Sequence, residues 1–365
     1  MGEPAPIARQ PAPPLPGDSA REFARASAPQ AISPDGTLPA ALLEELNRRS
    51  DRPGFRQLAF HLALLLLGAF LWGQALGHGP LAGAGLPPSL ALPLGLLGLL
   101  LLGLALAFAF CAMHEAGHRT AFASRPVNDA VAWWAGVLSF YNADFYRRYH
   151  QWHHRYTHQV GLDPELEDRP PTTGASYWLE LSAIPWWIGK IRGHLAGLLG
   201  DFGSRPYISR DAVPALKTSL RRQFGVYGLL FLVSLIGANG FLFWYWLLPL
   251  AIGQPLLRFV LLAEHGGCPF VADGLRNTRT TLTLAPLRWL MWNMPFHAEH
   301  HLYPSLPFHA LAAAHRSLAP ALGVVAPGYL AVHRSFLANL SALALPSPGG
   351  PGEGLSAVAP QPINH

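Results

Sequence analysis

Charged residues are scarce in this chain of 365 residues. They make up 13% of the sequence, whereas about 25% is usual for a soluble globular domain. No Asp, Glu, Lys or Arg interrupts residues 57–113 or residues 223–257. Each stretch is long enough for helices that cross a hydrocarbon core about 30 Å thick. The composition therefore excludes an ordinary soluble domain and predicts a polytopic membrane protein.

Cysteine and lysine are also rare. The two cysteines, Cys111 and Cys268, lie far apart and outside any CxxC pair, which argues against a disulfide framework or a zinc ribbon. Lysine occurs only as Lys190 and Lys217, so arginines supply most of the positive charge behind the net +5. These arginines flank the apolar stretches, where they suit lipid headgroups better than nucleic acid. We therefore expect no nucleic-acid partner.

The apolar stretches predict an all-α fold with four transmembrane helices and a cytoplasmic helical cap. Residues 224–263 would form about 60 Å of helix, enough for two crossings, and Asn239–Gly240 is a natural turn between them. These crossings belong to one domain, residues 41–345, between proline-rich tails at 1–40 and 346–365 that we expect to be disordered. The expected spans are about residues 57–77, 90–113, 224–238 and 241–263.

Positive charge sets the expected orientation. Four arginines, at positions 48, 49, 52 and 56, precede the first span and predict a cytoplasmic N-terminus. Four crossings then return the C-terminus to the same side, as in a bacterial inner-membrane protein. Residues 127–140 are too short to cross, and residues 177–199 mix tryptophan with Lys190 and Arg192, which is typical of an interfacial helix. We expect neither to cross, so all the histidine clusters share the cytoplasmic face.

Histidine is the residue in excess. Neutral imidazoles bind Fe, Zn, Cu or Ni, and one first-row ion rarely takes more than about six ligands. Positions i, i+3 and i+4 of a helix share one face, so a cluster with this spacing offers its imidazoles in one direction. Eight clustered histidines therefore predict two metal ions. The clusters are His114 and His118; His150, His153 and His154; and His297, His300 and His301.

The first cluster, His114-Glu-Ala-Gly-His118, also fits the HExxH motif of zinc metalloproteases. In that interpretation Glu115 is the general base on a zinc-bound water, and Asp163 is a distant metal ligand. A single catalytic zinc needs only three protein ligands. The interpretation leaves both HxxHH clusters unexplained, so we keep it as a minor alternative.

The three clusters, their order and their relation to the spans resemble the membrane fatty acid desaturase and hydroxylase superfamily, over about residues 58–318. The bacterial members are the most similar. The resemblance implies a di-iron site with one further histidine ligand between the fourth span and the third cluster, where this chain has His265. The segments that also fit are residues 119–122, 163–166, 293–296 and 304–309.

Several polar residues are candidates for a supporting role around the nine expected ligands. Metal-bound histidines usually donate their second ring nitrogen to a carboxylate, a carbonyl or a water. Superfamily members that act on acyl-CoA hold a water with an Asn four residues before the further histidine, where this chain has Leu261. Asn293 is the candidate to replace that Asn. The full set of candidates is Asn293, Asp163, Glu299, His158 and His309.

The resemblance implies an oxidoreductase that uses O₂ to introduce a double bond into an acyl chain, with two iron ions as cofactor. No amino-acid side chain can break an unactivated C–H bond, so the metal must supply this chemistry. The sequence has no ferredoxin cysteine set, cytochrome b5 signature or nucleotide fingerprint. An external electron donor, of ferredoxin or cytochrome b5 type with its reductase, is therefore expected. A hydroxylase or ketolase of an alkane, carotenoid or sphingolipid stays open, as does a non-catalytic metal carrier.

Overall fold

The computed structural model describes residues 37–78, 87–168 and 170–346. The expected disordered tails fall almost entirely outside these residues, as does most of the loop between the first two spans. In the described part, helices dominate, and the only strands are β1 (Thr280–Thr281) and β2 (Val325–Ala326), which pair in parallel. The predicted all-α class is therefore confirmed.

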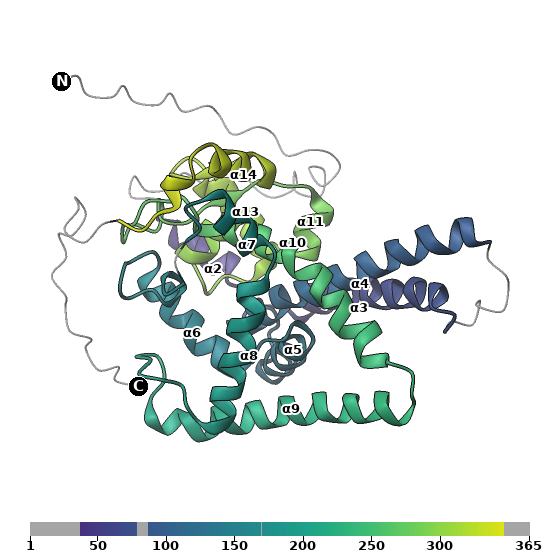
Figure 1. Ribbon diagram of the computed structural model, residues 1–365. Coiled ribbons are helices and arrows are strands. Elements are labelled where there is room, and N and C mark those ends of the chain that lie inside the picture. Colours follow the sequence, from purple (N-terminus) through teal and green to yellow (C-terminus); the bar gives the residue numbers. More distant parts are fainter. Residues whose placement is uncertain (1–36, 79–86, 169, 347–365) are drawn as a thin grey trace.

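Thirteen α-helices, four shorter helical turns and the two strands follow one another along the described chain (Figure 1). The short turns are η2 (Pro164–Leu166), η3 (Arg210–Ala212), the π-helix η4 (Phe243–Leu247) and η5 (Leu340–Leu343). The α-helices are α2 (Ala40–Leu46), α3 (Asp51–Ala75), α4 (Pro88–Gly117), α5 (Arg125–Ser139), α6 (Ala143–Tyr156), α7 (Gly174–Leu181), α8 (Ile184–Leu199), α9 (Val213–Ile236), α10 (Leu248–His265), α11 (Ala285–Leu290), α12 (His297–Leu302), α13 (Phe308–Leu318) and α14 (Tyr329–Ala338).

Three helices of the described chain are long and apolar enough to cross a membrane: α3, α4 and the continuous helix of η4 and α10. The expected third crossing lies on α9, whose first ten residues include Lys217, Arg221 and Arg222. The uncharged remainder, residues 223–236, would span about 21 Å as helix, less than the thickness of a hydrocarbon core. The count of four crossings is therefore not confirmed.

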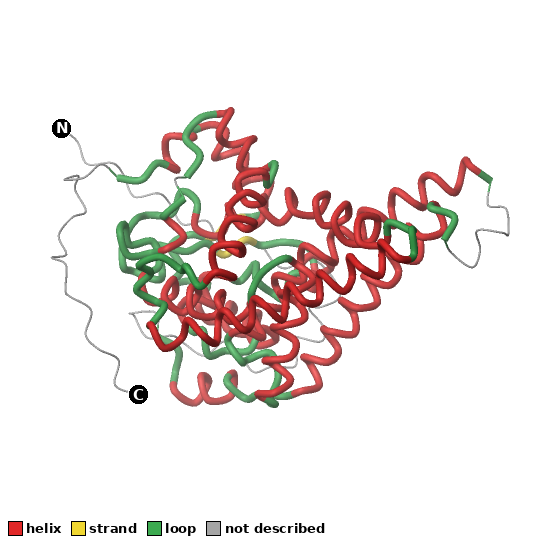
Figure 2. The backbone as a smooth tube through the Cα atoms, turned by 60° about the horizontal axis from the view of Figure 1, so that its bottom comes forward, coloured by secondary structure: helices red, strands yellow, loops and turns green. Residues whose placement is uncertain are grey.

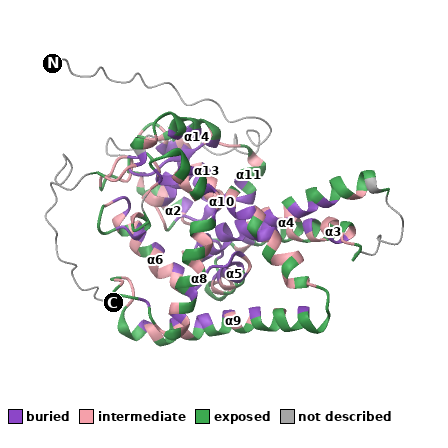
Figure 3. Cartoon of the chain, viewed as in Figure 1, coloured by how far each residue is buried: buried purple, intermediate pink, exposed green. Residues whose placement is uncertain are grey.

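Helix α4 has an exposed half and a buried half. Leu90, Leu92 and Leu96 near its start are more than half exposed, whereas residues 105–116 are all buried. Figure 1 shows α3 and α4 projecting together from the body, and Figure 3 shows burial concentrated where α4 enters it. In the tube view of Figure 2, most loops lie at the end of the molecule opposite to this projection. The N-terminal half of α4 is therefore exposed and apolar, and its C-terminal half places the first histidine cluster in the core.

Glycines let the apolar helices approach closely. A Cβ added to Gly253 of α10 would lie 2.0 Å from the carbonyl oxygen of Gly103 in α4. One added to Gly68 of α3 would lie 2.5 Å from the backbone nitrogen of Leu102. Such contacts exclude any larger side chain, as is common where membrane helices pack. The small residues of α4 therefore serve helix packing at these two positions.

The helices of the cap are shorter, and local residues determine where they begin and end. The side chain of Asn142 caps α6 by accepting a hydrogen bond from the backbone nitrogen of Phe145. The expected interfacial segment, residues 177–199, is divided into α7 and α8, because Ala183 adopts a left-handed conformation with φ of 61°. An apolar stripe on α8 is exposed, as an interfacial helix requires. It consists of Ile184, Ile188, Ile191 and Leu195.

Candidate metal centre

Four helices bring the nine predicted histidines together. The first cluster ends α4, with His114 in the last turn and His118 as the C-terminal cap. The second lies on one face of α6, His265 is the last residue of α10, and the third lies on α12. Residues separated by up to 187 positions thus surround one region in the core of the described chain. The candidate ligand atoms form two groups.

The first group contains five histidines from all three clusters. Their ring nitrogens lie within 4.8 Å of one another, with one nitrogen taken from each ring. The ring of His114 lies 4.4 Å from that of His150 and 4.6 Å from that of His300, measured between centroids. The Nε2 atoms of His150 and His154 face each other at 2.9 Å. The members of this group are His114, His118, His150, His154 and His300.

The second group contains His153, His265 and His301, again with ring nitrogens within 4.8 Å of one another. His297 adjoins it, because its Nε2 lies 3.2 Å from Nε2 of His265. The groups touch where the rings of His154 and His301 stack at a centroid distance of 4.1 Å. With His297 counted in the second group, the nine histidines divide into five and four, and a third set of His150, His153 and Glu165 links the two groups.

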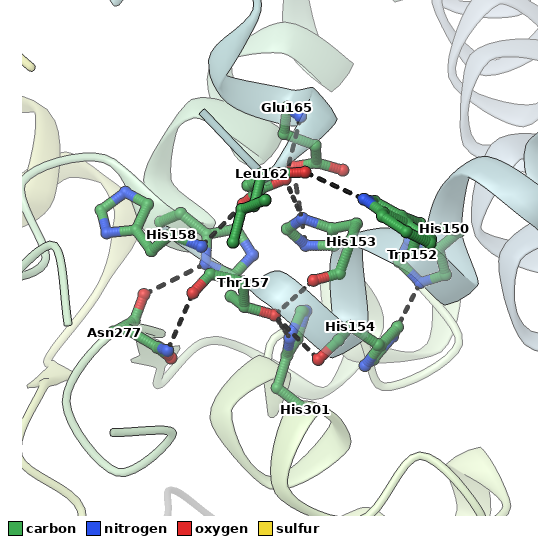
Figure 4. A network of polar contacts seen from close by, with 12 residues as sticks. His150, Trp152, His153, His154, Thr157, His158, Leu162, Glu165, Asn277 and His301 are labelled. Atoms are coloured by element: carbon green, nitrogen blue, oxygen red, sulfur yellow. Dashed lines mark hydrogen bonds and ion pairs between the residues drawn. The ribbon is translucent and has the colours of Figure 1, made fainter. Parts of the chain in front are cut away.

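Hydrogen bonds fix the rings of the second group (Figure 4). Nδ1 of His153 lies 2.8 Å from Oδ1 of Asp163, and Nδ1 of His301 lies 3.1 Å from Oγ1 of Thr157. Nδ1 of His265 lies 3.2 Å from the backbone carbonyl oxygen of Asn277. Each Nδ1 therefore donates its proton, and Nε2 of each ring carries the lone pair that a metal ion binds. In His153 and His301 this Nε2 has no hydrogen-bond partner among the described residues.

Burial favours the neutral form of most of the cap histidines. It lowers the pKa of His118 to about 3 and holds the pKa of His150, His154 and His300 well below the usual value. His153 differs: burial lowers its pKa, but the carboxylates of Glu165 and Asp163 outweigh that effect and leave it raised. Neutral imidazole is the ligand form for first-row metals, so the electrostatics of the cap suit metal binding.

The unpaired ring nitrogens of these histidines fit a metal site. Within the described chain, eight of the nine predicted ligands have a buried ring nitrogen without a hydrogen-bond partner, and both nitrogens lack one in His114 and His300. Buried polar atoms are nearly always paired, so such a concentration requires an explanation. Metal coordination supplies one, since it pairs several imidazoles with a single ion.

Carboxylates also approach the two groups. Oε2 of Glu264 lies 3.4 Å from Nε2 of His297, and Oε2 of the partly exposed Glu165 lies 3.7 Å from Nε2 of His153. Glu115 is fully buried, with Oε1 3.7 Å from Nδ1 of His300. These distances exceed a normal hydrogen bond. The three carboxylates therefore surround the histidines without orienting them as Asp163 does.

The other supporting candidates lie in different surroundings. The ring of His158 lies 5.8 Å from that of His265, and its Nδ1 donates to the carbonyl oxygen of Pro269 at 3.0 Å. Glu299 contacts His315 and Thr280. Asn293 donates to the carbonyl oxygen of Phe308, whose ring is also the neighbour of His309. Supporting roles for these four residues at the metal centre stay predictions.

Sequence reasoning missed Thr157 and Asn277. Thr157 follows His153 by four residues, and its hydroxyl donates to the His153 carbonyl oxygen at 2.8 Å, a common bond for Thr in a helix. That spacing is a readable signal. Asn277 contacts His265 through its backbone carbonyl oxygen, which any residue could supply. Only the folded chain reveals this contact.

Two comparisons with known proteins identify the family of this chain. Residues 90–333, more than half of the chain, match the fatty acid desaturase family. The chain is also similar to an sn-1 oleoyl-lipid 12-desaturase of Synechocystis sp., with 26% identity over 240 residues, which cover 59% of this chain. The match spans 66% of the length of that relative. The chain therefore belongs to the fatty acid desaturase family.

Proposed function

We propose that this chain is an O₂-dependent, di-iron fatty acid desaturase that acts on the acyl chain of a lipid. Family membership and the similarity to an acyl-lipid desaturase support an oxidoreductase of this kind. The observation that carries the proposal is the convergence of nine buried or half-buried histidines, eight of which have a buried ring nitrogen without a partner in the described chain. The three apolar helices support a membrane protein. The proposal includes a cytoplasmic site at the inner membrane and an external electron donor.

The five histidines of the first group would hold one iron, and the four of the second group would hold the other. When bound, such a metal pair supplies the O₂-dependent removal of hydrogen from an unactivated carbon, which no side chain can perform. The residues of the chain would orient the ligand rings and enclose the metal ions. Asp163, Thr157 and Asn277 hold the rings of His153, His301 and His265 in one tautomer, and burial keeps bulk water from the ring nitrogens.

The zinc-protease alternative does not account for these contacts. The hydroxyl of Thr120 donates to a carboxylate oxygen of Glu115 at 3.3 Å, and Asp163 is engaged with His153 rather than with His114 or His118. A hydroxylase would use the same ligands, because both reactions begin with removal of hydrogen from carbon. Its product differs in mass from an alkene, so product analysis separates the two.

Lipid profiling of a host that produces the chain tests the proposal. We expect new double bonds in the lipids of cells with the wild-type chain and none with a His153→Ala variant. His78→Ala is the matched control, because His78 is exposed after the end of α3 that lies opposite to the metal centre. The purified protein should contain about two irons per chain. Unchanged lipids, or one zinc per chain, would contradict the proposal.

A further inference from the structure

A cluster of hydrogen-bond donors lies outside the two histidine groups, around Tyr141 in the loop between α5 and α6. Nη2 of Arg258, on α10, donates to the Tyr141 hydroxyl oxygen at 2.9 Å. Nε1 of Trp186, on α8, donates to the same oxygen at 2.9 Å. Nζ of Lys190, one turn further along α8, lies 3.9 Å from the centroid of the Tyr141 ring. Two cations and an indole thus meet at one phenol.

The cluster has more donors than the one acceptor, the Tyr141 oxygen, can pair. A phenol oxygen has two lone pairs and one hydrogen, and Arg258 and Trp186 occupy both lone pairs of Tyr141. The hydroxyl hydrogen is therefore left to donate. Nε of Arg258 is buried without a partner. Within the described residues, no carboxylate oxygen lies within 4.0 Å of Lys190 or Arg258. Buried donors normally have partners, so an external acceptor fits here.

The nearest acidic residues act on these cations only at longer range. Burial raises the pKa of Glu180, and the charge of Arg258 opposes that rise from beyond ion-pair distance. Burial and the charge of Arg258 lower the pKa of Lys190 to about 7, against the opposing effect of Asp168 and Glu165. The surrounding carboxylates therefore leave the two cations incompletely neutralised, and an anion in direct contact would stabilise both.

The position of the cluster suits a lipid. The exposed stripe of α8, from Ile184 to Leu195, is apolar, so this helix can lie on the bilayer surface with Lys190 turned towards Tyr141. Arg258 belongs to a helix that is apolar enough to cross the membrane, where a charged residue is expensive and usually functional. Arg258 also precedes His265 by seven residues, which is about 10.5 Å along α10.

We propose that Lys190, Arg258 and the hydroxyl of Tyr141 bind the anionic oxygen headgroup of the lipid substrate, either a carboxylate or a phosphate. Two turns of α10 then separate the headgroup from the histidines, and this distance would set how far along the acyl chain the reacting carbons lie. This inference rests on the proposed function, because the metal centre defines where the chain must reach. It adds the class of substrate, an anionic lipid.

The test measures binding to the full-length, iron-loaded protein in neutral maltoside micelles by isothermal titration calorimetry. The probes are decanoate, decyl phosphate and the uncharged decanol, each corrected for mixing with protein-free micelles. We expect both Lys190→Met and Arg258→Met to weaken anion binding about tenfold or more, as for loss of a charged hydrogen bond. Decanol binding should not change. The preferred anion identifies the headgroup, carboxylate for a free acid and phosphate for a phospholipid.

Two variants serve as controls. Lys190→Arg keeps the charge and should retain anion binding, which shows that the site tolerates substitution. Lys217→Met removes the other lysine, whose Nζ contacts the Leu199 carbonyl oxygen at the C-terminal end of α8, nine residues beyond Lys190, and should bind like the wild type. Equal binding of all three probes by a wild-type protein that makes product would overturn the inference alone. Selective anion binding by an iron-loaded protein that makes no oxidised lipid would overturn the proposed function instead.

Discussion

The two histidine groups are built from the same side chain but are held in different ways. In the second group, three of the four rings donate Nδ1 to a protein oxygen, on Asp163, Thr157 or Asn277. In the first group of the described chain, the rings pack mainly against one another, at centroid distances of 4.4–4.9 Å. Hydrogen bonds preorganise one group and packing the other, so the two should respond differently to substitution.

Removing a ligand from either group should have the largest effect. His300 and His301 are neighbours on α12 but belong to different groups. We expect His300→Ala and His301→Ala each to reduce product formation by more than about 100-fold, beyond the usual effect of losing a supporting partner. Each variant should also lose about half of its iron, measured by elemental analysis, if two ions are bound.

The control for these variants is His78→Ala, which should keep both iron and activity. Full activity of His301→Ala would favour a single-metal enzyme of the HExxH kind. Loss of all iron from both variants would show that the two groups form one cooperative site, and the contrast between them would fail.

Asp163→Asn should have the next largest effect. Asn fills the same space but lacks the charge that fixes the His153 tautomer, and loss of such a partner typically reduces metal affinity or activity about 10–100-fold. The matched control is Glu167→Gln, an exposed carboxylate on the same loop, which should behave like the wild type. Titration of the metal-free protein with Fe(II) measures the change. Identical affinities in both variants would contradict an orienting role for Asp163.

The histidine pattern could be predicted because ligand spacing is local. His150, His153 and His154 share a face of any helix that contains them, and the structure has them on α6. The division into five and four is not local, because it depends on how α12 lies against α4 and α6. His300 and His301 are adjacent in sequence yet enter different groups. No spacing rule could have assigned them.

For the membrane helices, too, local features could be predicted from the sequence and non-local ones could not. The turn expected at Asn239–Gly240 does lie between α9 and η4, because glycine and asparagine favour turns in any context. Whether α9 crosses depends on the surroundings of Lys217 and Arg221 in its first half, which composition cannot supply. The polar face of α9 also packs on the cap, where Gln223 donates to the Tyr141 carbonyl oxygen at 3.1 Å. A mean hydropathy does not reveal such a contact.

Thr157→Val should have a smaller effect than Asp163→Asn. Valine keeps the shape of the side chain but removes the hydroxyl that accepts from His301 and donates to the His153 carbonyl oxygen. A neutral hydrogen bond is worth about 0.5–1.5 kcal/mol, so we expect a loss of about 2- to 13-fold in iron affinity. Thr218→Val is the matched control, because it removes the same kind of bond, to the Pro214 carbonyl oxygen, on α9. Equal losses in both variants would indicate a helix effect alone.

Glu115→Gln should have the smallest effect, although Glu115 lies inside the first histidine cluster. Its Oε1 is 3.7 Å from Nδ1 of His300, too far for a hydrogen bond, and glutamine can still accept from the Thr120 hydroxyl. We therefore expect product formation within about twofold of the wild type, since no net hydrogen bond is lost. A zinc protease requires this carboxylate as general base, so loss of all activity would support that alternative. A loss equal to that of Asp163→Asn, with iron affinity reduced as well, would show that a carboxylate also orients the first group, and the two groups would then differ in composition but not in the way they are held.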